Sequence, residues 1–209
     1  NNTVPVTLWF ENSSHAGEGT DMYFTSCLCT GLTLSGDIAS NGGVVMATAT
    51  FQTGYAPTEG TLEFTGGGGT HTVIGDQTTM FNMHDLTVET LNEQDLLLYG
   101  FELAIARPIN RIGFDNGSNF KPMGYSLGGY EVTGSLTCKR DAESTDAIDT
   151  STPVALALSA GDVYQIDAPK CVVDSSGISF DDDGWKQTIP FRCTYSGATS
   201  STIVSIKTA

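Results

Sequence analysis

The sequence predicts an all-β protein, a β-sandwich or barrel with at most one or two short helices. Three observations lead to this class. Many short segments alternate apolar and polar residues with the period of 2 that strands have. Turn-forming residues, above all the 24 glycines, separate these segments. The hydrophobic fraction of 39% supports a core, whereas the charged fraction is only 16%.

The clearest strand lies in the stretch GGYEVTGSLTCKRD, residues 128–141. Its apolar residues fall on one side of an extended chain: Tyr130, Val132, Leu136 and Cys138. Its polar residues fall on the other side: Glu131, Thr133, Ser135, Thr137 and Lys139. Gly134 interrupts the apolar row, where a missing side chain permits a bulge or a close backbone approach. The polar side is either an ordinary solvent face or a functional surface.

Similar patterns predict strands along the whole chain, which we expect to form a single domain over residues 1–209. The expected strands are 4–10, 23–34, 45–51, 62–64, 86–88, 99–105, 112–114, 154–158, 163–166, 171–173, 178–180, 189–195 and 202–206. Asn41-Gly42-Gly43 is typical of a hairpin turn. Only the stretch 141–149 indicates a helix, with Asp141 as its cap.

The charge of the chain disfavours several classes of partner. A formal charge of −15 disfavours binding to nucleic acid or to an anionic membrane through a basic surface. No apolar run approaches the ~20 residues of a membrane-spanning helix. The first residue is Asn, so we expect the chain to be processed or to begin inside a longer gene product.

The five cysteines are too few, and odd in number, for a disulfide scaffold. Four of them lie in apolar rows with a period of 2, where Cys acts as a small buried hydrophobic residue. We therefore expect free buried thiols, with disulfides as the alternative.

One string resembles a catalytic motif. GYSLG, residues 124–128, fits the G-x-S-x-G nucleophile elbow, which needs a helix after the serine. Here a strand follows, and all three histidines precede Ser126 instead of following it. We interpret the string as a Gly-rich turn and predict no enzymatic activity.

Two further strings resemble ligand loops. TGGGGT, residues 65–70, lacks the Gly-Lys-Ser/Thr ending of a phosphate loop, so it predicts a flexible loop tip. FDDDGWK, residues 180–186, lacks the bidentate Glu of a calcium loop and predicts a hairpin turn. The histidines show no ligand spacing, so we predict no metal and no cofactor.

Two long stretches, residues 22–54 and 98–143, resemble the tail tube proteins of long-tailed bacteriophages. The elements that recur are LTLSG, FELAIARP and GGYEVTGSLT, followed by a C-terminal segment that contains GISFDDDGWKQTIPFRC. Related proteins carry a further portion before the stretch that matches residues 20–35, so we expect a fragment or a compact variant.

The resemblance implies a structural virion protein of the phage tail. Its copies would form rings, contact other tail proteins, and stack into a tube through which DNA passes without specific binding. The polar side of residues 130–139 is then a candidate channel wall, with Glu131 as the candidate lumen-facing acid. Candidate inter-subunit residues lie in two Gly-rich loops: Gly66, Gly67, Gly68, Gly69, Asp115, Asn116 and Gly117.

Two alternatives remain at this stage. A secreted or cell-surface β-sandwich that binds or adheres would show the same content of Thr, Ser and Gly. Another virion β protein, such as a capsid decoration protein, would do so too. Electron microscopy of the purified protein would separate tubes or rings from monomers and from subunits bound to a shell.

Overall fold

The computed structural model describes residues 5–10, 22–59, 81–114, 122–148, 151–161, 164–195 and 202–208. Most of these residues form strands, and the one α-helix among them, α1 (Ala142–Asp146), is short. The predicted all-β class is therefore confirmed. The chain divides into two compact units, one of residues 1–31, 49–78 and 107–129, and one of residues 32–48, 79–106 and 130–209.

The first unit contains short antiparallel pairs. β1 (Val6–Phe10) pairs with the start of β2 (Met22–Asp37), which also pairs with β4 (Thr58–Glu59). β8 (Ile109–Phe114) and β9 (Pro122–Leu127) form a separate two-stranded ribbon. The Nη2 atom of Arg111 donates a hydrogen bond of 2.7 Å to the carbonyl oxygen of Thr53, which ties β8 to the segment after β3 (Met46–Gln52).

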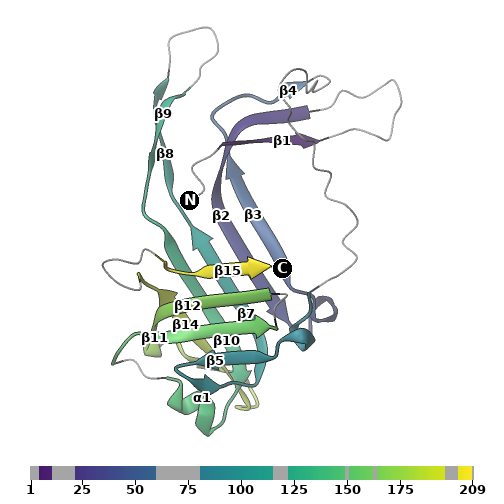
Figure 1. Cartoon of the computed structure of the whole chain (residues 1–209), viewed down its shortest axis with the longest axis vertical. Coiled ribbons are helices and arrows are strands. Elements are labelled where there is room, and N and C mark those ends of the chain that lie inside the picture. The colour runs from purple at the N-terminus through teal and green to yellow at the C-terminus, as the bar shows by residue number, and fades with distance from the viewer. Residues whose placement is uncertain are drawn as a thin grey trace. The chain divides into compact units, whose positions relative to one another are not determined.

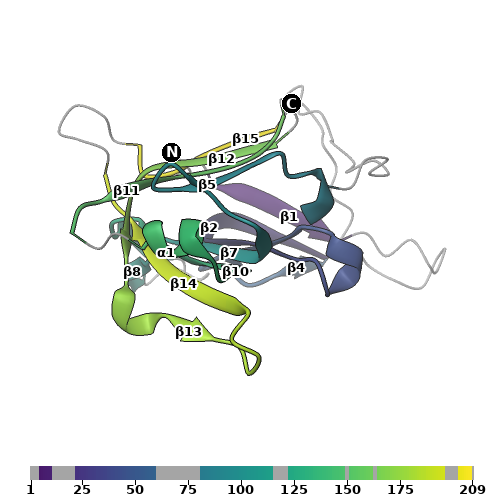
Figure 2. The same cartoon turned by 90° about the horizontal axis from the view of Figure 1, so that it is seen from below.

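The second unit is a sandwich of two layers (Figures 1 and 2). The first layer contains the end of β2 and four further strands: β7 (Leu98–Ala106), β10 (Glu131–Lys139), β14 (Lys186–Cys193) and β13 (Ser179–Phe180). The second layer contains β15 (Ser205–Thr208), β12 (Tyr164–Val173), β11 (Val154–Ala160), β5 (Val88–Leu91) and β6 (Gln94–Asp95). β12 joins the layers, because its last residues pair with β14.

The core lies between these layers. Alternate residues of β7, β10 and β14 point into it from one side, and those of β11 and β12 from the other. Leu136, Ile189 and Ile166 are fully buried there. Cys138, Cys171 and Cys193 are also buried, and all five cysteines are free, as the apolar rows predicted.

The turn predicted at Asn41-Gly42-Gly43 and the helix cap predicted at Asp141 are confirmed, whereas the loop predicted at residues 65–70 and the strand predicted at 62–64 lie outside the described residues. Three 3-10 turns, η1 (Asn41–Gly43), η2 (Met83–Asp85) and η3 (Ser175–Gly177), connect strands. Asn41 and Gly42 both have positive φ, as expected of the hairpin-type turn. Asp141 caps α1 by accepting a hydrogen bond of 3.0 Å from the backbone N–H of Ser144.

Two predictions are wrong. GYSLG is not a turn, because residues 124–127 belong to β9 and Ser126 pairs with Asn110 of β8. Residues 163–166 and 171–173 were expected as two strands, yet β12 is continuous through Pro169. The register of β12 with β11 shifts between Val154 and Leu156, and a bulge of this kind accommodates a proline that cannot donate a hydrogen bond.

Candidate functional site

The outward side of the first layer in the second unit is a continuous polar surface, which we call the polar face. It consists of Ser35, Asp37, Gly100, Glu102, Ala104, Glu131, Thr133, Ser135, Thr137 and Lys139. The inward partners on the same strands, such as Leu34, Leu103 and Leu136, are buried in the core. The two sides therefore follow from the period of 2 that the sequence already displays.

The register of β7 with β10 sets which polar groups are neighbours. Glu102 lies opposite Ser135, Ala104 opposite Thr133, and Ala106 opposite Glu131. On the other side of β10, Thr137 lies opposite Thr188 of β14, and their hydroxyl oxygens are 3.2 Å apart. Because directly paired residues share a face, the outward row of β14 continues the polar face.

Glycines bring the strands of this face close together. A Cβ atom on Gly100 would lie 3.0 Å from the carbonyl oxygen of Gly36 in β2. A Cβ atom on Gly134 would lie 2.5 Å from Cζ of Phe191 and would also collide with the carbonyl oxygen of Glu102. The close backbone approach predicted for Gly134 is confirmed, and the ring of Phe191 fills the space beside it.

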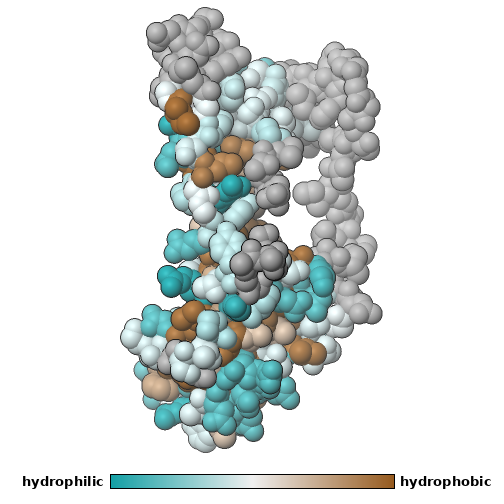
Figure 3. Space-filling view, turned by 60° about the vertical axis from the view of Figure 1, so that its left-hand side comes forward, coloured by the Kyte–Doolittle hydropathy of each residue, from teal (hydrophilic) through white to brown (hydrophobic). Residues whose placement is uncertain are grey.

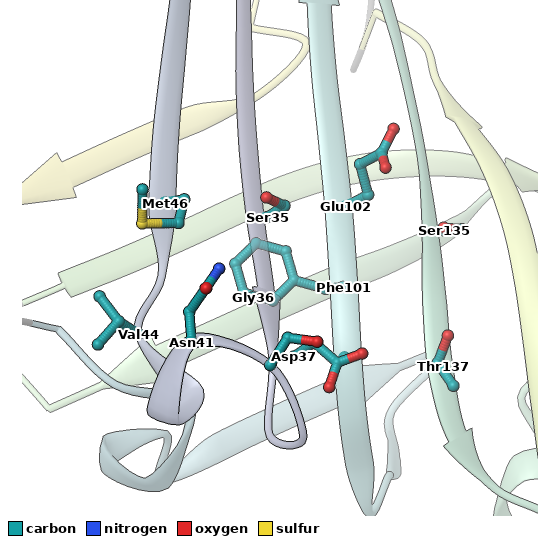
Figure 4. A pocket seen from close by; sticks show the side chains of 12 residues that line it. Ser35, Gly36, Asp37, Asn41, Val44, Met46, Phe101, Glu102, Ser135 and Thr137 are labelled. Carbon is teal, nitrogen blue, oxygen red and sulfur yellow. The ribbon is translucent and has the colours of Figure 1, made fainter.

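A hollow of about 260 Å³ opens on the polar face where β2, β7 and β10 meet (Figure 4). Asp37, Glu102 and Thr137 line it from three successive strands, and Asn41 and Met46 close one side. Asp37 also stabilises the turn after β2, because its Oδ1 atom accepts a hydrogen bond of 2.6 Å from the backbone N–H of Ala39. The lining contains hydroxyls and carboxylates, which suit a wet surface better than a tight ligand site.

The charge of the polar face changes from strand to strand. β2, β7 and β10 contribute the acids Asp37, Glu102 and Glu131, all three exposed. Lys139 is the cation on the part of the polar face that β2, β7 and β10 form among the described residues. Its Nζ atom lies 3.6 Å from the Oδ2 atom of Asp141. On β14, outward Lys186 and Arg192 change the sign. The part of the face over β2, β7 and β10 is therefore acidic, and its edge on β14 is basic.

The predicted site residues fall into two groups. Glu131 is exposed at the start of β10, on the polar face as its period predicted. The candidate loop residues Gly66, Gly67, Gly68, Gly69, Asp115, Asn116 and Gly117 lie outside the described residues.

Asp37 and Glu102 are the acids of this face that the sequence reasoning missed. The signal for Glu102 was present, because it alternates with Phe101 and Leu103 in the row that predicted β7. The signal for Asp37 was weaker, since Asp before a turn has a local explanation.

Comparison with known proteins identifies a family for this chain. A family model described as phage tail tube protein matches residues 6–193. No curated protein matches the chain. Over the part of the chain that the structure describes, no helix has the length and apolar character to cross a membrane.

Proposed function

The chain belongs to the phage tail tube protein family, and on that premise we propose that its copies form rings that stack into a hollow tube for DNA. Family membership makes it a structural protein of the virion tail that assembles with other copies and with other tail proteins. The ring, the stacking and the passage of DNA are our proposal.

The observation that carries the proposal is the polar face. A channel wall for DNA needs a surface that stays wet and offers the phosphates no cations to bind. The part of the face over β2, β7 and β10 combines Asp37, Glu102 and Glu131 with small hydroxyl residues. Repulsion from such a wall keeps DNA mobile, because no Lys or Arg patch is there to release counterions. We therefore assign this part of the face to the lumen.

The rest of the second unit fits a building block for such a wall. The opposite side of the same layer is covered by the second layer and by a core with fully buried Leu136, Ile166 and Ile189. A sheet that is packed on one side keeps its twist and register, so its outward side presents a fixed surface. The 24 acids against 9 basic residues also keep free subunits soluble before assembly.

Electron microscopy and site-specific labelling test the proposal together. We expect the purified protein, or tails recovered from particles, to show rings or tubes in micrographs. We also expect a Glu102→Cys variant to react with a maleimide on a bulky polymer as a free subunit and to be protected in the tube. The polymer cannot enter the channel, whereas it reaches a residue on the outer surface.

A Glu143→Cys variant on α1 is the matched control, because Glu143 is also an exposed acid but lies off the polar face. The parent protein gives the background from Cys29, which is only half-buried. Monomers at every concentration would contradict the ring. Equal labelling of Glu102→Cys in tubes and in subunits would contradict the lumenal assignment.

A further inference from the structure

An exposed aromatic hairpin projects from the first layer of the second unit. β13 and β14 are joined by the turn Asp181–Trp185, and in Figure 2 this hairpin lies on the side away from the second layer. Trp185 is 69% exposed and Phe180 is 54% exposed. We call residues 180–185 the aromatic hairpin.

The aromatic hairpin is held rigidly. The Asp181 carboxylate accepts a hydrogen bond of 3.0 Å from the backbone N–H of Lys186, and the N–H of Gly184 donates one of 2.9 Å to the carbonyl of Asp181. The guanidinium carbon of Arg140 lies 4.6 Å from the ring centroid of Phe180. The backbone N–H of Arg140 donates a hydrogen bond of 2.8 Å to the carbonyl of Trp185. A preorganised surface of this kind loses little entropy when it binds.

The aromatic hairpin differs from the other exposed apolar residues of the described surface. The space-filling view shows small, separate hydrophobic areas among hydrophilic ones on the described surface that it presents (Figure 3). Single exposed apolar residues are normal, but a Trp presented by a hydrogen-bonded hairpin turn is the kind of side chain that anchors an interface.

A second concave surface lies at the other end of β14. A hollow of about 520 Å³, which we call the Arg192 hollow, lies at the border of the polar face and is lined by Thr133, Val172, Asp174, Pro190 and Arg192 among others. A volume of this size is typical of pockets that hold small organic groups, so it accommodates an indole ring. Val172 and Pro190 supply apolar contact, and the exposed Arg192 supplies a cation for the face of an aromatic ring.

The two surfaces are complementary in charge. The tip of the aromatic hairpin carries Asp182 and Asp183, and the cations Arg140 and Lys186 lie at its base. Lys170 lies two positions from Val172 on β12 and adds to the charge of Arg192. The Asp174 carboxylate is the exception in the hollow. It already accepts hydrogen bonds from the N–H and the hydroxyl of Ser176, at 3.0 and 2.6 Å. A carboxylate at that place is also an acceptor for the indole N–H of an inserted Trp.

Their spacing points to contact between copies. Trp185 directly precedes β14 and Arg192 lies near its end, seven positions further on, which corresponds to roughly 24 Å along an extended strand. Such a distance prevents Trp185 from reaching the hollow of its own chain. Two different surfaces that fit each other make a head-to-tail contact, and contacts of this type generate closed rings or open filaments.

We propose that Trp185 of one copy inserts into the Arg192 hollow of a second copy of this chain. Asp182 and Asp183 of the first copy then face Lys170 and Arg192 of the second. This inference rests on the proposed ring-forming function and names the surfaces through which the copies meet.

Sedimentation velocity over a range of protein concentrations tests the contact in three proteins: the parent, Trp185→Ala and Arg192→Glu. We expect the parent to assemble, and each variant to need at least about tenfold more protein for the same degree of assembly, as for the loss of an interface anchor. Leu97→Ala and Lys207→Glu are matched controls, because both remove exposed residues of the same unit outside the two surfaces. They should assemble like the parent.

Mixing the two variants gives a sharper result. Trp185→Ala keeps an intact hollow, and Arg192→Glu keeps an intact hairpin, so one good contact can form between them. At a protein concentration where the parent assembles and each variant alone stays monomeric, we expect their mixture to give dimers that do not grow. A partner other than a second copy would leave the mixture as two monomers.

The outcomes separate this contact from the proposed function. If the parent forms rings or tubes and Trp185→Ala does so equally well, the function stands and the contact is wrong. If the mixture stays monomeric while the parent assembles, the hairpin does not meet the hollow and the contact is again wrong. If the parent never assembles, the proposed function and this inference both fall.

Discussion

At the scale of single residues, Gly134 is the position where packing leaves least freedom. Replacing it with Ala places a Cβ atom against Phe191 and the carbonyl oxygen of Glu102. We expect Gly134→Ala to lower the free energy of unfolding by about 1–3 kcal/mol, the usual cost of overpacking. Thermal or denaturant unfolding of the purified protein measures this.

Gly124→Ala is the control for that substitution. Gly124 is also a strand glycine, but a Cβ atom there would meet nothing within 4 Å. We expect it to leave the stability unchanged or to raise it slightly, because Ala restricts the unfolded chain. Equal losses at both positions would show that crowding at Gly134 is not the cause, and an unchanged stability of Gly134→Ala would show that the ring of Phe191 moves aside.

The buried thiols make a second prediction at this scale. Burial raises the pKa of the Cys138 thiol to about 11, so its reactive thiolate is scarce at neutral pH. The hydrogen bond to Cys193, at 3.4 Å between the sulfur atoms, and burial raise the pKa of Cys171 as well.

We therefore expect iodoacetamide to leave Cys138 and Cys171 unmodified in the folded protein and to modify both after unfolding in guanidinium. Mass spectrometry of the digested protein reads out each site, and half-buried Cys29 serves as the internal reference. Rapid modification of Cys138 at neutral pH would contradict the buried position of this side chain.

At the scale of elements, the sequence predicted best where one face of a strand is buried. The apolar rows of β7 and β10 predicted both strands, because Phe101, Leu103 and Leu136 alternate with outward residues, and the row of β10 also predicted its polar side. The turn predicted for GYSLG was wrong because the local pattern and the strand pairing disagree there. Its glycines and serine favour a turn locally, but pairing with β8 holds Ser126 in a strand, and such long-range pairing is invisible in a local pattern.

The two-residue strands could not be predicted from the sequence either. β4 and β6 exist only because neighbouring strands pair with them, and two residues carry no period. Pro169 favoured a break between two strands, yet the bulge against β11 absorbs it. Glu131 was located because it lies in a long regular row, whereas Asp37 lies at a strand end where the period stops.

The cap of α1 gives a prediction for an element. Its backbone hydrogen bond from Ser144 and the nearby charge of Lys139 lower the pKa of Asp141. We expect Asp141→Ala to cost about 1 kcal/mol at pH 7, the usual value for losing a cap. A lowered pKa means that the charged cap stabilises the fold above the ordinary Asp pKa, and that this contribution disappears as the pH falls through the folded value.

The difference in stability between the parent and Asp141→Ala should accordingly shrink in acid, below a pH of about 4. Denaturant unfolding at a series of pH values measures it. Asp141→Asn keeps a side-chain acceptor without the charge and should lose less stability at neutral pH. A difference that stays constant into acid would show that the carboxylate charge plays no part.

At the scale of the whole molecule, the question is what the formal charge of −15 does. Solubility would need only an even spread of acids. Three acids, Asp37, Glu102 and Glu131, lie where β2, β7 and β10 present their outward residues, and the cations Lys186 and Arg192 lie on β14. This division suits a lumen that repels DNA next to an edge that meets a neighbouring copy.

Charge reversal on the polar face separates these two roles. The triple variant Asp37→Lys, Glu102→Lys and Glu131→Lys changes the formal charge by two units per position, from −15 to −9. We expect particles with this tube protein to eject DNA more slowly, because lysines in the wall bind phosphates. The screening length at 0.15 M salt is ~8 Å, so the effect should grow as the salt concentration falls.

The control reverses three exposed acids off the polar face, Asp95, Glu143 and Asp146, and gives the same net charge. Micrographs first establish that both variants build tubes of normal length, so that ejection reports on the wall and not on assembly. Normal ejection by the polar-face variant at low salt would show that its acids do not face the DNA. Slow ejection by both variants would assign the effect to net charge, whereas slow ejection by the polar-face variant alone would mean that the position of the acids decides how DNA passes.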